Sequence, residues 1–357
     1  CMVHINAGVD KKCPIDQARV LIYINHALLC HERGEPVSAT AMKLMLRLVN
    51  LVALANGLKE RSKFSFLLTD THGILSQIAR RNGEHFEAAW EMLCGIEHLG
   101  DGSAAQEAFF SYSQGIRQLR IGNAHRAIKL LDVALAGGLD ATHRPRAHYT
   151  KLLALRISSR ASDFASFLPE AKLAVGNTPT TTDIAWQEIC WELQTSHNMK
   201  PMIAALKDTA SPLHNVYYRL EGCLWGLATN SKSNYATCPP ISRDELALVA
   251  KSPAFVAVCK GLAAIENFYD HRAPQEKRLQ ALGAALVAAR RCFGVEFELL
   301  LLAGAWRALI RHRKTGFADL VLDEYITLSR RLSDGRSDDV LGMARIVGEK
   351  TTLNKAS

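Results

Sequence analysis

The stretch SYSQGIRQLRIGNAHRAIKLLDVAL, residues 111–135, determines how this chain is expected to fold. Apolar residues recur in it every three or four positions, which is typical of a helix with one buried face. The pattern breaks once, at Gly122, and then resumes. Small residues recur within the stretch, at Gly115, Gly122, Ala127 and Ala134. The stretch therefore predicts two helices, at 103–121 and 124–137, that are joined by a tight turn.

The placement of these small residues resembles a tetratricopeptide (TPR) repeat, in which two antiparallel helices pack closely. The resemblance implies that Gly115 faces Ala127 across the helix pair and that Gly122 forms the turn. It also implies that Ala134 packs on the following helix. A weaker copy lies upstream, where Gly83 takes the turn position 39 residues before Gly122.

Helical periodicity continues along the chain, without the alternation and turn dipeptides that mark β-hairpins. Together with the resemblance, this predicts an all-α fold, a right-handed α-α superhelix of about eight antiparallel helix pairs. We expect TPR-like repeats over 1–228, a polar loop containing two prolines at 229–241, and further helical repeats over 242–357 that continue the first part. The other helices expected from these signals are 14–33, 38–56, 60–81, 84–99, 142–159, 162–175, 181–196, 200–209, 212–228, 242–250, 253–270, 274–292, 295–313, 316–332 and 337–349.

Two local patterns give sharper expectations. Ser211-Pro212 places proline where the first residue of a helix tolerates it, so the helix at 212–228 is expected to begin there. Near the end of the chain one helical stripe is apolar and is expected to be buried. Its members are Phe317, Leu320, Val321, Leu328 and Leu332.

The nine cysteines are scattered singly, with no Cys-x-x-Cys motif and an odd total. This usage argues against a disulfide framework and predicts a reducing compartment, so we expect an intracellular protein of the cytoplasm or nucleus. No apolar run reaches eighteen residues, which predicts no membrane association through a spanning helix. The start at Cys1, with Met2 behind it, suggests a fragment.

The common catalytic signatures are absent, including phosphate-binding loops, dinucleotide-binding glycine motifs and zinc-protease helices. We therefore expect no enzyme, no catalytic residue, no cofactor and no metal. Asp70 and His72 are too close in sequence to share a helix face. Trp186 and Trp191, which flank Cys190, fit either a pocket or a pair of core anchors.

The charge distribution points to a binding surface. The formal net charge is +8, and residues 117–160 contain nine Lys and Arg residues against two acids. Arg117 and Arg120 lie one turn apart, and in TPR proteins the first helix of each pair lines the inner groove, so this pair could bind a carboxylate or an acidic segment. An ordinary solvated face is the competing interpretation. The residues expected to contact a partner are Arg117, Arg120, Arg126, Arg144, Arg146 and Lys151.

Three functions remain open from the sequence. The leading hypothesis is a non-enzymatic scaffold or adaptor that holds an extended or acidic segment of a partner protein in its superhelical groove, as a subunit of a larger complex. The second is a regulatory, effector-sensing TPR-like domain of a larger signalling or transcription-activating protein. The third is a basic helical-repeat nucleic-acid binder, which the shortage of aromatic residues in the basic stretch disfavours.

Overall fold

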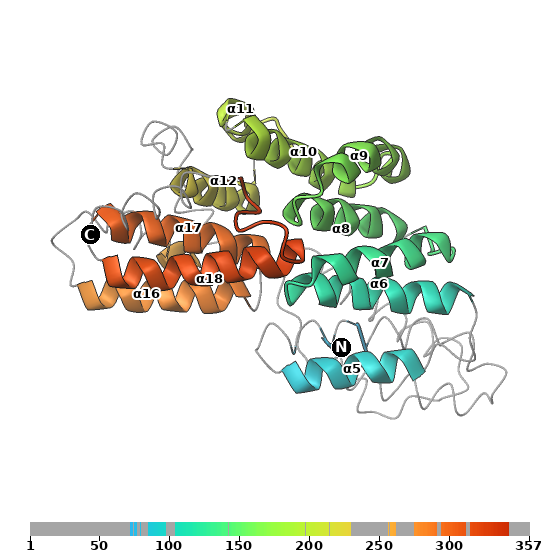
Figure 1. Cartoon of the computed structure of the whole chain (residues 1–357). Helices are drawn as coiled ribbons and strands as arrows, with labels where there is room; N and C mark the ends of the chain where they lie inside the picture. The colour runs from blue at the N-terminus through green and yellow to red at the C-terminus, as the bar shows by residue number, and fades with distance from the viewer. Residues whose placement is uncertain are drawn as a thin grey trace, which may run out of the picture. The chain divides into compact units, whose positions relative to one another are not determined.

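Figure 1 shows the computed structural model of the chain. It divides into two compact units, residues 1–106 and 107–357, which are described separately below. The residues that the structure describes are 72–73, 75–76, 79, 85–97, 104–141, 143–196, 198–213, 215–229, 256, 258–261, 275–290, 294–311 and 315–342.

The predicted all-α class is confirmed, because the described residues form helices joined by turns and short loops. Helix α5 belongs to the first unit, and α6 begins just before the boundary between the units. The described helices are α5 (His85–Glu97), α6 (Ala104–Arg120), α7 (Ala124–Ala136), α8 (His143–Ile157), α9 (Ala161–Val175), α10 (Thr180–Ser196), α11 (Lys200–Lys207), α12 (Val216–Ala228), α16 (Gln275–Ala288), α17 (Val295–Arg311) and α18 (Thr315–Ser333).

In the first unit, α5 carries a buried carboxylate. Glu91 accepts a hydrogen bond from the ring of His72 across 2.8 Å, and both side chains are buried. His72 thus finds its acid on a packed helix. Its sequence neighbour Asp70 lies outside the described residues.

The α6–α7 turn has the geometry that the small residues predicted. Gly122 has a φ of +83°, in the left-handed region that favours glycine, and Asn123 caps α7 by accepting a hydrogen bond from the amide of Arg126. A Cβ atom on Gly115 would lie 2.9 Å from Leu131 Cγ and 3.4 Å from the carbonyl oxygen of Ala127. The local predictions for Gly115 and Gly122 are therefore confirmed.

Ala134 and Ala147 are fully buried in one apolar cluster, which places α7 against α8 as the sequence predicted. Packing between helices that are close in sequence continues along the chain, since α8 packs on α9 and α10, and α11 packs on α12. The large core extends from Leu119 to Leu341 and includes the fully buried indoles of Trp186, Trp225 and Trp306.

Helix α18 packs against the α6–α7 turn, although the two lie far apart in sequence. Arg331 Nη1 donates to the carbonyl oxygen of Ile121 across 3.3 Å, and a Cβ on Gly122 would lie 3.3 Å from Leu328 Cδ1. In Figure 1 the orange-red helix α18 ends beside the turn that joins the two helices α6 and α7. A linear repeat array has contacts between neighbouring units only, so this long-range closure is a further feature of the fold.

The start of α12 differs from the prediction. The helix begins at Val216, not at residue 212, because the Asn215 side chain accepts hydrogen bonds from the amides of Tyr217 and Tyr218. Asparagine is a strong N-cap, so it fixes the first turn. Ser211 and Pro212 form the preceding bend.

Two expectations for the C-terminal region are also wrong in part. Residues 337–342 of the predicted helix 337–349 form turns, because Asp334 and Gly335 have positive φ and the Ser333 hydroxyl accepts a hydrogen bond from the Ser337 amide. Within α18, Phe317 and Leu320 are 53% and 67% exposed. The buried face of α18 is instead formed by Ala318, Leu322, Tyr325, Leu328 and Leu332.

The predicted loop at 229–241 and most of the expected helices between 242 and 270 lie outside the described residues. Thr229 is described, and its hydroxyl bonds back to the carbonyl oxygen of Trp225 at the end of α12.

We expect Gly122→Ala to lower the free energy of unfolding by about 1–2 kcal/mol, because alanine is strained at positive φ. Its Cβ would also press on Leu328. The matched control is Gly283→Ala in the middle of α16, where a Cβ meets no atom within 4 Å. That change should stabilise the protein by roughly 0.5–1 kcal/mol. Urea unfolding followed by circular dichroism measures both, and equal effects would contradict the assignment of the turn.

Candidate functional site: a buried polar cluster and a basic turn

Arg156 lies at the centre of a buried polar cluster. Its guanidinium group is 0% exposed and donates from all three nitrogens, to Gln187 Oε1 and Gln194 Oε1 of α10 at 2.7 Å and to Glu296 Oε1 of α17 at 2.5 Å. Helix α8 presents Arg156 on the side that faces α10, while Lys151 on the other side of the helix faces α7 and α9. The arginine thus joins three helices in the core.

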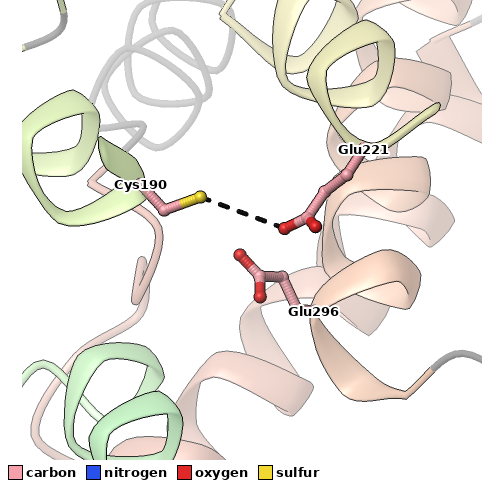
Figure 2. A group of neighbouring side chains, drawn as sticks. All are labelled: Cys190, Glu221 and Glu296. Carbon is pink, nitrogen blue, oxygen red and sulfur yellow. Dashed lines mark hydrogen bonds between the residues drawn. The ribbon is translucent and has the colours of Figure 1, made fainter. Parts of the chain in front are cut away.

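A second carboxyl group lies beside this ion pair. Glu221 of α12 is 2% exposed and accepts a hydrogen bond from the indole of Trp186 across 2.8 Å. The Cys190 thiol lies 4.0 Å from the other oxygen of Glu221. Figure 2 shows that Cys190, Glu221 and Glu296 point toward one another from three different helices.

Burial controls the protonation of these groups. It raises the pKa of Glu221 well above its ordinary value, and the negative charge of Glu296 raises it further, whereas Arg156 and Trp186 oppose the change. Burial also raises the pKa of the Cys190 thiol. For Arg156, burial is the largest single effect and acts to lower the pKa, but Glu296, Cys190 and Glu221 together raise the pKa above its ordinary value.

The cluster also fixes the end of the described chain. Gln194 Nε2 donates to the carbonyl oxygen of Val340 across 2.8 Å, and a Cβ on Gly342 would lie 2.6 Å from the Gln194 carbonyl oxygen. Gln194 therefore bonds Arg156 and the segment after α18 at the same time.

The sequence carries signals for single members of this cluster but none for their meeting. Trp186 is a core anchor, since it is 1% exposed and packs against the tilted ring of Tyr218, with the ring centroids 4.9 Å apart. Trp191 stacks on Phe164 with ring centroids 4.5 Å apart. Arg156 belongs to the basic stretch 117–160, but its position within the apolar run Leu152–Ile157 indicates that it is buried.

The six residues predicted to contact a partner do not form one patch. The rings of Phe109 and Tyr112 pack against His143, so the start of α8, with Arg144 and Arg146, lies beside the first half of α6. Arg120 is eight residues beyond Tyr112, about 12 Å further along the helix axis. Arg117, Arg120 and Arg126 therefore gather near the α6–α7 turn, away from Arg144 and Arg146.

At the turn, the basic character is reinforced by α18. Arg117, Arg120 and Arg126 are exposed, and the exposed Arg331 lies against Ile121 and Gly122. We call these four residues, Arg117, Arg120, Arg126 and Arg331, the basic turn. Three elements, α6, α7 and α18, contribute to it, and the last of these was not part of the sequence prediction.

Lys151 and Arg146 have different surroundings. Lys151 pairs with Asp132 at 2.7 Å and lies over the ring of Phe167, in a cleft of about 290 Å³ between α7, α8 and α9. Arg160 pairs with Asp163 in the same cleft, so its charges are compensated internally. Burial raises the pKa of Tyr112 to about 12, and the positive charge of Arg146 opposes this rise. Burial also raises the pKa of Asp183, and Arg146 again acts to lower it.

Comparison of the chain with family models, with curated proteins and with solved structures found no match. Among the described helices, none is long and apolar enough to cross a membrane.

We expect Arg156→Met to lower the free energy of unfolding by about 3–5 kcal/mol, because it leaves Glu296 buried without its cation. Lys172→Met is the matched control, since the Lys172–Glu188 pair is half exposed and contributes about 0–1 kcal/mol. Guanidinium denaturation of both variants measures the difference. A cost for Arg156→Met as small as that of the control would show that the cluster does not hold these helices together.

Proposed function

We propose that the chain is a non-enzymatic, TPR-like helical scaffold that binds an acidic, extended segment of a partner protein at the basic turn. The observation that carries the proposal is the convergence of four exposed arginines from α6, α7 and α18 on one turn. Arginine suits this role because its planar guanidinium group binds a carboxylate with two parallel hydrogen bonds.

The arginines differ in their own partners. Among the described residues, the guanidinium groups of Arg117 and Arg126 make no ion pair, whereas Arg330, next to Arg331, is bound by Asp338 at 2.5 Å. A cation without an internal partner can bind an external anion without first breaking a salt bridge. This favours Arg117 and Arg126 as the first contacts with the partner.

The turn is also well fixed, which favours binding. Gly122 sets its backbone, Asn123 caps α7, and Arg331 bonds the carbonyl oxygen of Ile121. Groups held in place before binding lose less conformational entropy when they bind.

The contacts of α17 favour a partner site at the α6–α7 turn rather than in an inner groove along α8 and α10. In a TPR-like superhelix, α8 and α10 would be first helices of their pairs, whose inner faces line the groove. Here Arg156 of α8 binds Glu296 of α17, and Gln187 and Gln194 of α10 accept hydrogen bonds from Arg156. The proposed superhelix of about eight pairs would therefore have part of its groove filled by its own helix.

Among the described cysteines, Cys190 and Cys259 form no disulfide, which supports an intracellular setting.

The test uses a fluorescein-labelled oligoglutamate peptide and fluorescence anisotropy with the full chain. The double variant Arg117→Glu/Arg120→Glu should weaken binding by about tenfold or more, because two attractive charges become repulsive. Lys200→Glu/Lys207→Glu, which reverses two exposed cations of α11, is the control and should change the affinity little.

Equal binding by the parent and the Arg117/Arg120 variant would refute the basic turn as the contact surface. A labelled single-stranded RNA tested in parallel separates the nucleic-acid hypothesis. If RNA bound more tightly than the peptide and lost affinity steeply with salt, the partner would be a nucleic acid and the protein-scaffold proposal would fail.

A further inference from the structure

Three side chains with metal-binding atoms meet in the core of the second unit. Cys190 of α10, Glu221 of α12 and Glu296 of α17 offer one ligand atom each, and these atoms lie within 4.8 Å of one another (Figure 2). A tetrahedral Zn²⁺ with Zn–S near 2.3 Å and Zn–O near 2.0 Å holds a sulfur and an oxygen ligand about 3.5 Å apart and two oxygen ligands about 3.3 Å apart. The observed 4.0 Å between Cys190 Sγ and Glu221 Oε1 needs only a small contraction. We propose that Cys190, Glu221 and Glu296 bind one zinc ion.

Each of the three ligands lies next to an N–H group that can donate a hydrogen bond to its ionised form. Trp186 Nε1 donates to Glu221 Oε2, and Arg156 Nη2 donates to Glu296 Oε1. A carboxylate has two oxygens, so Glu296 can hold Arg156 and a metal at the same time. Donors of this kind orient metal ligands and tune their affinity.

The third donor is the independent indication of a ligand. Trp225 is 1% exposed, and within the described part of the chain its indole N–H has no acceptor at normal hydrogen-bond geometry. The group that it faces is the sulfur of Cys190. A thiol is a weak acceptor, but a metal-bound thiolate carries negative charge and would satisfy this N–H.

The charges of the cluster balance with a divalent cation. When a metal displaces the protons of Cys190 and Glu221, the thiolate and the two carboxylates carry three negative charges against the one positive charge of Arg156. Two negative charges then remain in a core where Cys190 and Glu221 are 0% and 2% exposed. Buried charge is costly unless it is compensated, and one Zn²⁺ compensates it completely.

The ligand set favours zinc over the other common divalent cations. Mg²⁺ and Ca²⁺ prefer ligand sets made only of oxygen, whereas Zn²⁺ accepts sulfur and carboxylate together. Since the ligands are buried, the metal would enter as the chain folds, and binding would release the protons of Cys190 and Glu221 to solvent. The ion would then join α10, α12 and α17.

The test measures metal content and metal affinity of the full chain. The protein is expressed with added zinc and analysed by elemental mass spectrometry, and it is also refolded without metal and titrated with ZnCl₂ or CoCl₂. The parent should retain one zinc per chain, and its cobalt form should show a sulfur-to-cobalt charge-transfer band. Cys190→Ala should lose this band and more than about 100-fold in affinity, since loss of an outer partner alone costs about 10–100-fold.

Two further variants make the result specific. Cys223→Ala removes another buried thiol, on α12 but outside the ligand set, and should bind zinc as the parent does. Trp225→Phe keeps all three ligands and should weaken zinc binding by about 10–100-fold. It also provides the comparison if Cys190→Ala does not fold.

A folded parent chain that contains no zinc and binds neither metal on refolding would overturn the proposal. So would an unchanged charge-transfer band in Cys190→Ala. The outcome is independent of the proposed scaffold function, because oligoglutamate binding at the basic turn uses none of these residues.

Discussion

The guanidinium group of Arg156 is fully shielded from water, so its hydrogen bonds and its charge must be satisfied by the protein itself. It meets this requirement with Gln187 and Gln194 of α10 and Glu296 of α17. These acceptors lie 31, 38 and 140 residues away in sequence. The second unit therefore depends on bringing α8, α10 and α17 together around one charge.

The remaining contacts of the core follow from this arrangement. Once Glu296 is fixed, Glu221 of α12 lies beside a second carboxylate, and Trp186 stabilises it from α10. Gln194 extends the network to Val340, beyond α18. Helix α18 in turn reaches the α6–α7 turn through Arg331 and Leu328. A buried ionic centre thus connects, through packed helices, with the exposed basic turn.

The two proposed sites have opposite physical characters. The basic turn is an exposed, positively charged surface that suits an acidic segment in water. The Cys190–Glu221–Glu296 cluster is a dehydrated group of ionisable side chains that suits a small cation once Cys190 and Glu221 are ionised. The first depends on the outer ends of helices, and the second on their buried faces.

The sequence by itself determined the local structure of the protein. Periodicity predicted the helices within a few residues at most ends, and Gly115 and Gly122 predicted the close helix pair, because these effects depend on neighbours along the chain. The sequence offered two possible starts for α12, Ser211-Pro212 and Asn215, and the helix begins after Asn215 instead of at the expected residue 212. The face of α18 was also misjudged, since its packing is decided by α7 and α17 and not by its own pattern.

Only the tertiary structure decided which charges are buried and which are exposed. In the sequence, Arg156 and Arg117 belong to the same basic stretch, yet one is an internal ion-pair partner and the other lies on the surface. The meeting of Cys190, Glu221 and Glu296 could not be predicted either, because their spacings carry no helical or motif signal. Such groups are brought together by long-range packing. The entropy lost in closing the chain and the stabilisation from buried hydrogen bonds depend on which distant helices meet.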